Sequence, residues 1–152
     1  MANNNYDSGR NRFSAGIGSV GSYQVSGVPW ITGSGADGLA TKTEDKITFP
    51  SVAKSVMVQL HDTNSDVIHV HFNSSGSNGG VWEGNHFFPL TTDESSITFN
   101  VKCKEIWVSN PATGNGGSGN ASGYRVVAEL TGIAADQMFN LTGSGLTTTD
   151  GT

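Results

Sequence analysis

The sequence is poor in charged residues, in cysteine and in long apolar runs. Only 14% of the 152 residues are charged, and the formal net charge of -5 comes without the cluster of Lys and Arg that attracts nucleic-acid phosphates. Cys103 is the single cysteine, which excludes an internal disulfide framework. No apolar stretch approaches the roughly 18 residues of a membrane helix. We therefore expect neither nucleic acid nor a membrane as a partner.

The first residues, MANNNY, lack the apolar segment of a secretory signal, so we expect synthesis in a reducing cytoplasm. Long runs of helix-forming residues are also missing, whereas the 21 glycines and the many Ser, Thr and Asn residues favour turns. A chain of this length buries roughly two thirds of its unfolded surface without disulfides or a metal. The composition therefore indicates one domain of short strands joined by turns.

Apolar runs of four to eight residues, separated by turn residues, predict the strands. The strongest runs are residues 46–50, 55–60, 67–72, 86–90, 96–101, 105–109 and 124–130. Their number and spacing predict an all-β fold, a single antiparallel β-sandwich or jelly-roll-like barrel whose body spans residues 46–133. Residues 133–138 have the pattern of one helical turn. The apolar positions change from odd to even numbers near Cys103, which indicates a bulge or a corner between sheets.

Polar segments at both ends predict extended arms. Residues 1–22 are expected to form a flexible N-terminal arm, residues 23–45 an edge strand or strap and a loop, and residues 134–152 a C-terminal strap and tail. The phrase Thr-Gly-Ser-Gly follows both Ile31 and Leu141 but lacks the Lys-Ser/Thr ending of a phosphate loop. We interpret it as the point where each strap leaves the body. The interface candidates are Tyr23, Val25, Val28, Trp30, Ile31, Phe139 and Leu141.

Two histidines on one predicted strand are the sharpest candidate for a metal site. His69 and His71 are two residues apart, so their imidazoles point the same way, as metal sites on β-barrels require. A third ligand would come from His61 or His86. However, the spacing to Glu83 differs from that of cupins, and two histidines on a solvent-facing strand or at a subunit contact need no metal. We favour no metal and no other cofactor, and keep His69 and His71 as the residues that would hold one.

Catalytic and sugar-binding residues are few. Cys103 lies between Lys102 and Lys104, which would lower the pKa of its thiol, but its odd number places it in the inward register of a small core residue. No nucleophile motif or paired carboxylates stand out, so we do not expect an enzyme. Trp82, in a Gly-rich segment, is the best candidate for stacking on a sugar ring.

Several segments together carry a resemblance. They are residues 21–34 (GSYQVSGVPWITGS), 47–50 (ITFP), 68–72 (IHVHF), 100–106 (NVKCKEI) and 128–133 (AELTGI). In this order they resemble small virion structural proteins of tailed bacteriophages, especially those that infect marine cyanobacteria. The similarity covers about residues 20–146, and its motifs are structural rather than catalytic.

The resemblance implies a capsid decoration (cement) protein on the surface of the virion head, synthesised in the host cytoplasm. Its partners would be the major capsid protein or other virion proteins, and copies of itself in a homo-oligomer, for which a trimer is one arrangement. No binding residue is carried over from the family. The alternative is a lectin-like receptor-binding, fibre or tail component that recognises host surface glycan through Trp82.

Overall fold

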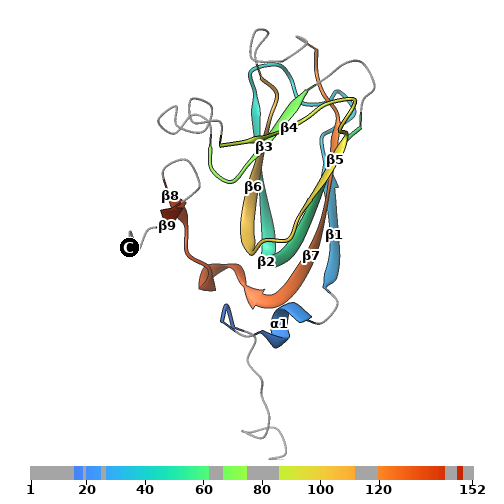
Figure 1. Cartoon of the computed structure of the whole chain (residues 1–152). Helices are drawn as coiled ribbons and strands as arrows, with labels where there is room; N and C mark the ends of the chain where they lie inside the picture. Colours follow the sequence, from blue (N-terminus) through green and yellow to red (C-terminus); the bar gives the residue numbers. More distant parts are fainter. Residues whose placement is uncertain are drawn as a thin grey trace, which may run out of the picture.

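The computed structural model describes residues 16–18, 20–24, 27–61, 67–74, 86–111, 120–142 and 147–148, and the fold is all-β, as predicted (Figure 1). The strands of the main sheet are β1 (Val28–Gly33), β2 (Glu44–Leu60), β3 (Ile68–His71), β4 (Phe88–Leu90), β5 (Ser96–Phe99), β6 (Cys103–Ser109) and β7 (Tyr124–Ala134). The smaller elements are the helix α1 (Gly21–Gln24), the 3-10 turn η2 (Ala135–Gln137) and the strands β8 (Leu141–Thr142) and β9 (Thr147–Thr148). None of the helices in the described part of the chain is long and apolar enough to cross a membrane.

The long strand β2 belongs to both layers of the sandwich. Its first half pairs with β6, and its second half pairs with β7 on one side and β5 on the other. The register shifts between Thr48 and Ala53, where the strand bends from one layer into the other. We predicted separate strands at 46–50 and 55–60, which is wrong. One strand continues through Pro50 because this residue lies in the irregular stretch, where no ladder hydrogen bond needs its missing N–H.

The predicted corner near Cys103 is present. β5 pairs with the second half of β2, whereas β6 pairs with the first half, so the chain changes layers over residues 100–102. Ile97 and Phe99 pack against the core from one layer, and Ile106 and Val108 are buried from the other. The change from odd to even apolar positions therefore results from the crossing of the chain between layers.

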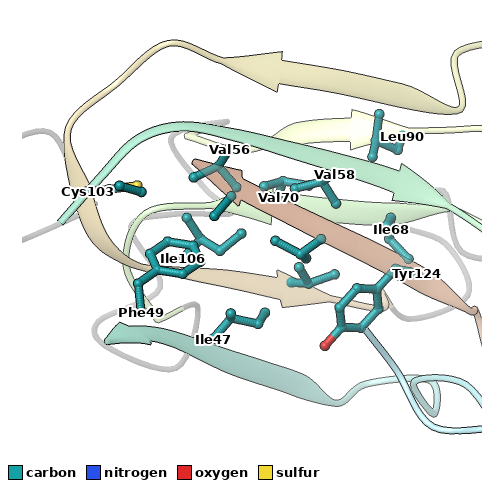
Figure 2. Packing of buried hydrophobic residues seen from close by; sticks show 14 of the residues in the cluster. Ile47, Phe49, Val56, Val58, Ile68, Val70, Leu90, Cys103, Ile106 and Tyr124 are labelled. Carbon is teal, nitrogen blue, oxygen red and sulfur yellow. The ribbon is translucent and has the colours of Figure 1, made fainter. Parts of the chain in front are cut away.

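One apolar cluster fills the space between the two layers (Figure 2). Ile68 and Val70 of β3 face this cluster, on the opposite side of the strand from His69 and His71. From β1, Trp30 meets Phe49 of β2 edge-on, with ring centroids 5.3 Å apart and planes at 90°. Each fully buried Val, Leu, Ile or Phe side chain stabilises the fold by about 1.5–3 kcal/mol. The buried members of the cluster are Leu39, Ile47, Phe49, Ala53, Val56, Val58, Leu60, Ile68, Val70, Leu90, Cys103, Ile106, Val108, Tyr124, Val126, Ala128 and Leu130.

A second, smaller cluster, which we call the corner cluster, lies at the β2 bend. Val52, Ile133 and Met138 are buried there, and Ile17 and Tyr23 pack against them. The hydroxyl of Tyr23 donates to the carbonyl of Ile17 at 3.2 Å. The segment around α1 is thus part of the folded body, although most of it was assigned to the N-terminal arm; residues 1–15 lie outside the described residues. The predicted arm included Ile17, whose side chain packs with that of Tyr23 against the buried cluster.

Candidate interaction surfaces and polar sites

The edge strand β1 turns half of its backbone groups away from the sheet. It is the first strand in the sheet order, and among the described strands it pairs only with β7. Next to β1, the N–H of Ser34 donates to the carbonyl of Tyr124 at 3.1 Å, which continues the β1–β7 register. In an antiparallel pair, hydrogen-bonded positions alternate. The even-numbered residues of β1 therefore bond to β7, and Pro29, Ile31 and Gly33 direct their backbone groups outward.

The other side of β7 gives the same alternation. The N–H of His61 donates to the carbonyl of Gly123 at 2.7 Å, in continuation of the β2–β7 register. Odd-numbered residues of β7 therefore bond to β2, which leaves its even-numbered residues for β1. Pro29 lacks an N–H and sits at a position whose N–H would face outward, which is where edge strands tolerate proline.

Two of the interface candidates are exposed on this strand. The exposed fractions are 65% for Val28 and 67% for Ile31. Ile31 stands opposite Val127 of β7 on the outer face of the sheet, and Val127 stands opposite Met57 of β2. Trp30 differs from these two residues, because its half-buried ring packs against the core. Val25 lies outside the described residues.

The remaining candidates lie around the corner cluster and the C-terminal segment. Tyr23 is half-buried in the corner cluster, and Phe139 is 42% exposed. Leu141 is half-buried and shares a small apolar hollow with Phe72, Cys103 and Phe139. β8 and β1 lie on opposite sides of the molecule (Figure 1). The straps that were predicted at the two ends thus occupy different surfaces.

The two histidines are buried, so they do not lie on a solvent-facing strand, which was one of the alternatives to a metal site. The exposed fraction is 3% for His69 and 0% for His71. The His69 ring stacks on Phe87 with centroids 3.9 Å apart. His71 lies between the carbonyl of Asn73, 2.5 Å from Nδ1, and the hydroxyl of Ser109, 2.9 Å from Nε2. Since a carbonyl only accepts, Nδ1 carries the proton and Nε2 accepts from Ser109.

Burial keeps both imidazoles neutral at pH 7. It lowers the pKa of His69 to about 4, and the nearby His71 acts in the same direction. Burial also lowers the pKa of His71, against the opposing effects of the Asn73 carbonyl and of the Glu44 carboxylate, which is 3.7 Å from Nε2. The hydroxyl of Ser74 donates to the other oxygen of Glu44 at 2.6 Å. This cluster is a connected polar network that joins three strand ends.

Within the described ranges, no group of three His, Cys, Asp or Glu side chains is arranged to hold a metal ion. His61 is exposed beside Gly123, and His86 is half-buried just before β4. Both ring nitrogens of His71 are already engaged with Asn73 and Ser109. The alternation of His69 and His71 thus placed them on one face correctly, but it did not show what covers that face.

Sequence reasoning missed the pair of Ser109 and His71, because 38 residues separate them. A serine hydroxyl at hydrogen-bond distance from a neutral imidazole is the arrangement of a nucleophile and its base. Here, however, Ser109 is only 1% exposed, so its oxygen is closed to a substrate. The pair is a buried hydrogen bond that fixes β3 against β6.

The environment of Cys103 removes its reactivity. The thiol is buried, and burial raises its pKa to about 12. The neighbouring lysines turn elsewhere: Lys102 Nζ donates to the carbonyl of Ile17 at 3.0 Å, and Lys104 Nζ donates to that of Met138 at 3.1 Å. The lysines therefore anchor the two terminal segments to the body and leave the thiol as a small core group.

A polar hollow of about 120 Å³ lies at one end of the sandwich, between the loop after β1 and the start of β7. Asp37, His61 and Arg125 contribute its charged and polar side chains. One guanidinium nitrogen of Arg125 donates to the carbonyl of Tyr124 at 3.2 Å. Trp82, the predicted sugar-stacking residue, lies outside the described residues, so the structure does not relate it to this hollow.

The chain matches no protein family model and no curated protein sequence.

Proposed function

We propose that this protein is a structural component of a tailed-phage virion, a capsid decoration (cement) protein that binds the head surface and stabilises the shell through its terminal segments. The observation that carries the proposal is the exposed edge of β1, with Val28 and Ile31 in solvent. Exposed apolar groups beside outward-facing backbone groups suit a protein that joins other subunits by strand addition.

The state of the reactive side chains supports a structural role rather than an enzymatic one. The Cys103 thiol is buried with a raised pKa, and the hydroxyl of Ser109 is bonded to a buried, neutral His71. Tyr124 is buried, and its hydroxyl donates to Asp45 at 2.8 Å. The hydroxyls of Ser109 and Tyr124 thus hold strands together, and the thiol of Cys103 fills part of the core.

Symmetric repetition makes modest contacts sufficient for this function. A decoration protein binds many identical sites on a shell, and copies that are linked to one another gain affinity from a high effective concentration. The short edge and few exposed apolar side chains of this protein are therefore compatible with tight attachment to an assembled head.

Purified virions test the proposal. We expect mass spectrometry to find the protein at a fixed ratio to the major capsid protein, and electron cryomicroscopy to place its sandwich on the outer head surface. Heads that lack the protein should lose DNA at a lower temperature, and added purified protein should restore the original temperature. Heads of equal stability that show no density for the protein would contradict the proposal.

The polar hollow favours one alternative, a lectin-like receptor-binding, fibre or tail component. Asp37, His61 and Arg125 offer the hydrogen-bonding groups that sugars bind through. If this alternative holds, the protein binds host glycans on an array, and Trp82→Ala and Arg125→Ala each reduce that binding. If no glycan on the array binds the protein, the lectin-like alternative is ruled out.

A further inference from the structure

The outward-facing groups of β1 form a short ladder that another strand can complete. The N–H groups of Ile31 and Gly33 and the carbonyls of Pro29, Ile31 and Gly33 point away from β7, according to the alternation derived above. An added strand bonds to these groups without disturbing any bond between β1 and β7. Among the described strands only β7 pairs with β1, so within this part of the chain the edge is available to a partner.

The outer face beside this edge is apolar in the middle and charged at its ends. A row of side chains runs from Met57 through Val127 to Ile31, one from each of three neighbouring strands. On one side of this row Glu129 stands opposite Pro29, and on the other side Arg125 stands opposite Gly33. Opposite charges thus flank Ile31 along the direction of the strand.

We infer that a second copy of this chain adds its β1 antiparallel to this edge, around a two-fold axis at Ile31, so that two sheets become one. In this register Ile31 faces Ile31 of the second copy, and each donates its N–H to the carbonyl of the other. Gly33 faces Pro29 of the second copy, and its N–H donates to that proline's carbonyl. The missing N–H of Pro29 limits the pairing to this short central ladder.

The charge distribution is compatible with the antiparallel orientation and adds only a long-range attraction screened by salt, because the two β1 strands lie between the charged side chains. An antiparallel copy brings the Glu129 end of one chain level with the Arg125 end of the other, whereas a parallel copy would bring like charges level. Lys54 Nζ lies 3.2 Å from Glu129 Oε2, which moderates the charge of that carboxylate but does not reverse it. The row of Met57, Val127 and Ile31 then continues across the axis into the same row of the second copy.

The exposure of Ile31 fits this occupant better than an unrelated protein. An isologous contact requires a self-complementary surface, and this edge pairs an apolar centre with itself and each charged end with its opposite. The inference goes beyond the virion role and does not depend on it, because the pairing involves this chain alone.

Sedimentation velocity of the purified full chain tests the pairing. We expect a concentration-dependent species with twice the 15.8 kDa mass of the chain. Ile31→Pro removes the outward N–H and no bond to β7, and Ile31→Lys brings two positive charges together at the axis. Each should raise the dissociation constant by roughly tenfold or more, with an unchanged circular dichroism spectrum and melting temperature. Thr98→Lys, an exposed position on the outer face of β5, is the matched control and should leave the dimer intact.

Amide hydrogen exchange tests the backbone contacts directly. The N–H groups of Trp30 and Thr32 should be protected at every concentration, because they bond to β7. Those of Ile31 and Gly33 should gain protection only as the dimer forms, and should lose it in Ile31→Lys. Protection of Ile31 and Gly33 that is independent of concentration would overturn the inference, since it would show that the chain covers its own edge.

Three further outcomes would overturn it: a wild-type chain that stays monomeric, a trimer, or a dimer that Ile31→Pro leaves unchanged. The virion experiments separate this result from the proposed function. A monomer that still decorates heads would contradict only the pairing, and a dimer that is absent from virions would contradict only the virion role.

Discussion

The side-chain amide of Asn110 donates a hydrogen bond to the carbonyl of Leu39 at 2.8 Å, although 71 residues separate them. The same amide nitrogen reaches the carbonyl of Asn120 at 2.7 Å and the hydroxyl of Ser122 at 3.3 Å. The backbone of Asn110 bonds in turn to Lys42 and Thr43. One buried side chain thus joins the loop before β2 to the segment before β7.

We expect Asn110→Ala to lower the free energy of unfolding by about 1–3 kcal/mol, because it removes the hydrogen bonds of a buried amide, while the carbonyls of Leu39 and Asn120 keep donors in Ser122 and Thr41. Urea denaturation measures the change. Asn100→Ala, at an exposed position, is the matched control and should stay within about 0.5 kcal/mol of the wild type. Equal effects of the two substitutions would show that the Asn110 network does not stabilise the fold.

A second prediction concerns the close approach of β1 to β7. A Cβ added at Gly33 would collide with the carbonyl oxygen of Tyr124, whereas one added at Gly35 meets nothing within 4 Å. We therefore expect Gly33→Ala to destabilise the protein by about 1–3 kcal/mol and Gly35→Ala to have little effect. Thermal melting of both variants checks this. A Gly33→Ala variant as stable as Gly35→Ala would mean that the ends of β1 and β7 separate at little cost.

The strands were predictable because alternation records which side of a strand is buried. In β7 the buried Val126, Ala128 and Leu130 share one face, and the change of phase around Cys103 marks the crossing between layers. The continuity of β2 was not predictable, because a proline such as Pro50 usually ends a strand. Only the pairing on both sides of the bend shows that one strand continues through it.

The polar sites were less predictable than the strands. His69 and His71 were assigned to one face, but the burial of that face depends on Phe87, Ser109 and other distant parts of the chain. Lys102 and Lys104 flank Cys103 in sequence, yet both extend to carbonyls of the terminal segments. Local spacing shows the direction of a side chain, and it does not show which partner the fold brings to it.

The buried histidines predict a specific loss of stability in acid. The pKa of His69 is 6.5 in the unfolded chain and about 4 in the fold. Because the folded value is the lower one, the stabilisation is complete above pH 6.5 and is lost as the pH falls toward 4, by up to about 1.4 kcal/mol per pH unit. His71, whose pKa is also lowered, adds to the slope in the same direction.

Denaturation at a series of pH values measures this slope. His69→Gln should flatten the dependence below pH 6.5, although it also lowers stability at pH 7 through the lost stacking on Phe87. His61→Gln is the control, because it removes an exposed histidine and keeps both buried ones. A slope that is equally steep in His69→Gln would assign the acid sensitivity to carboxylates instead.

The last prediction concerns the thiol of Cys103, which is 2% exposed and has a pKa of about 12. At pH 8 the thiolate is then a very small fraction, and the sulfur is also shielded from reagents, so alkylation should proceed only through opening of the fold. We expect iodoacetamide to label native protein far more slowly than protein in denaturing urea. Asn110→Ala should accelerate labelling about tenfold for each 1.4 kcal/mol of lost stability if the opening is global. Fast labelling of the native wild type, unaffected by Asn110→Ala, would show that the corner between β5 and β6 opens on its own and that the lysine anchors to Ile17 and Met138 do not hold it closed.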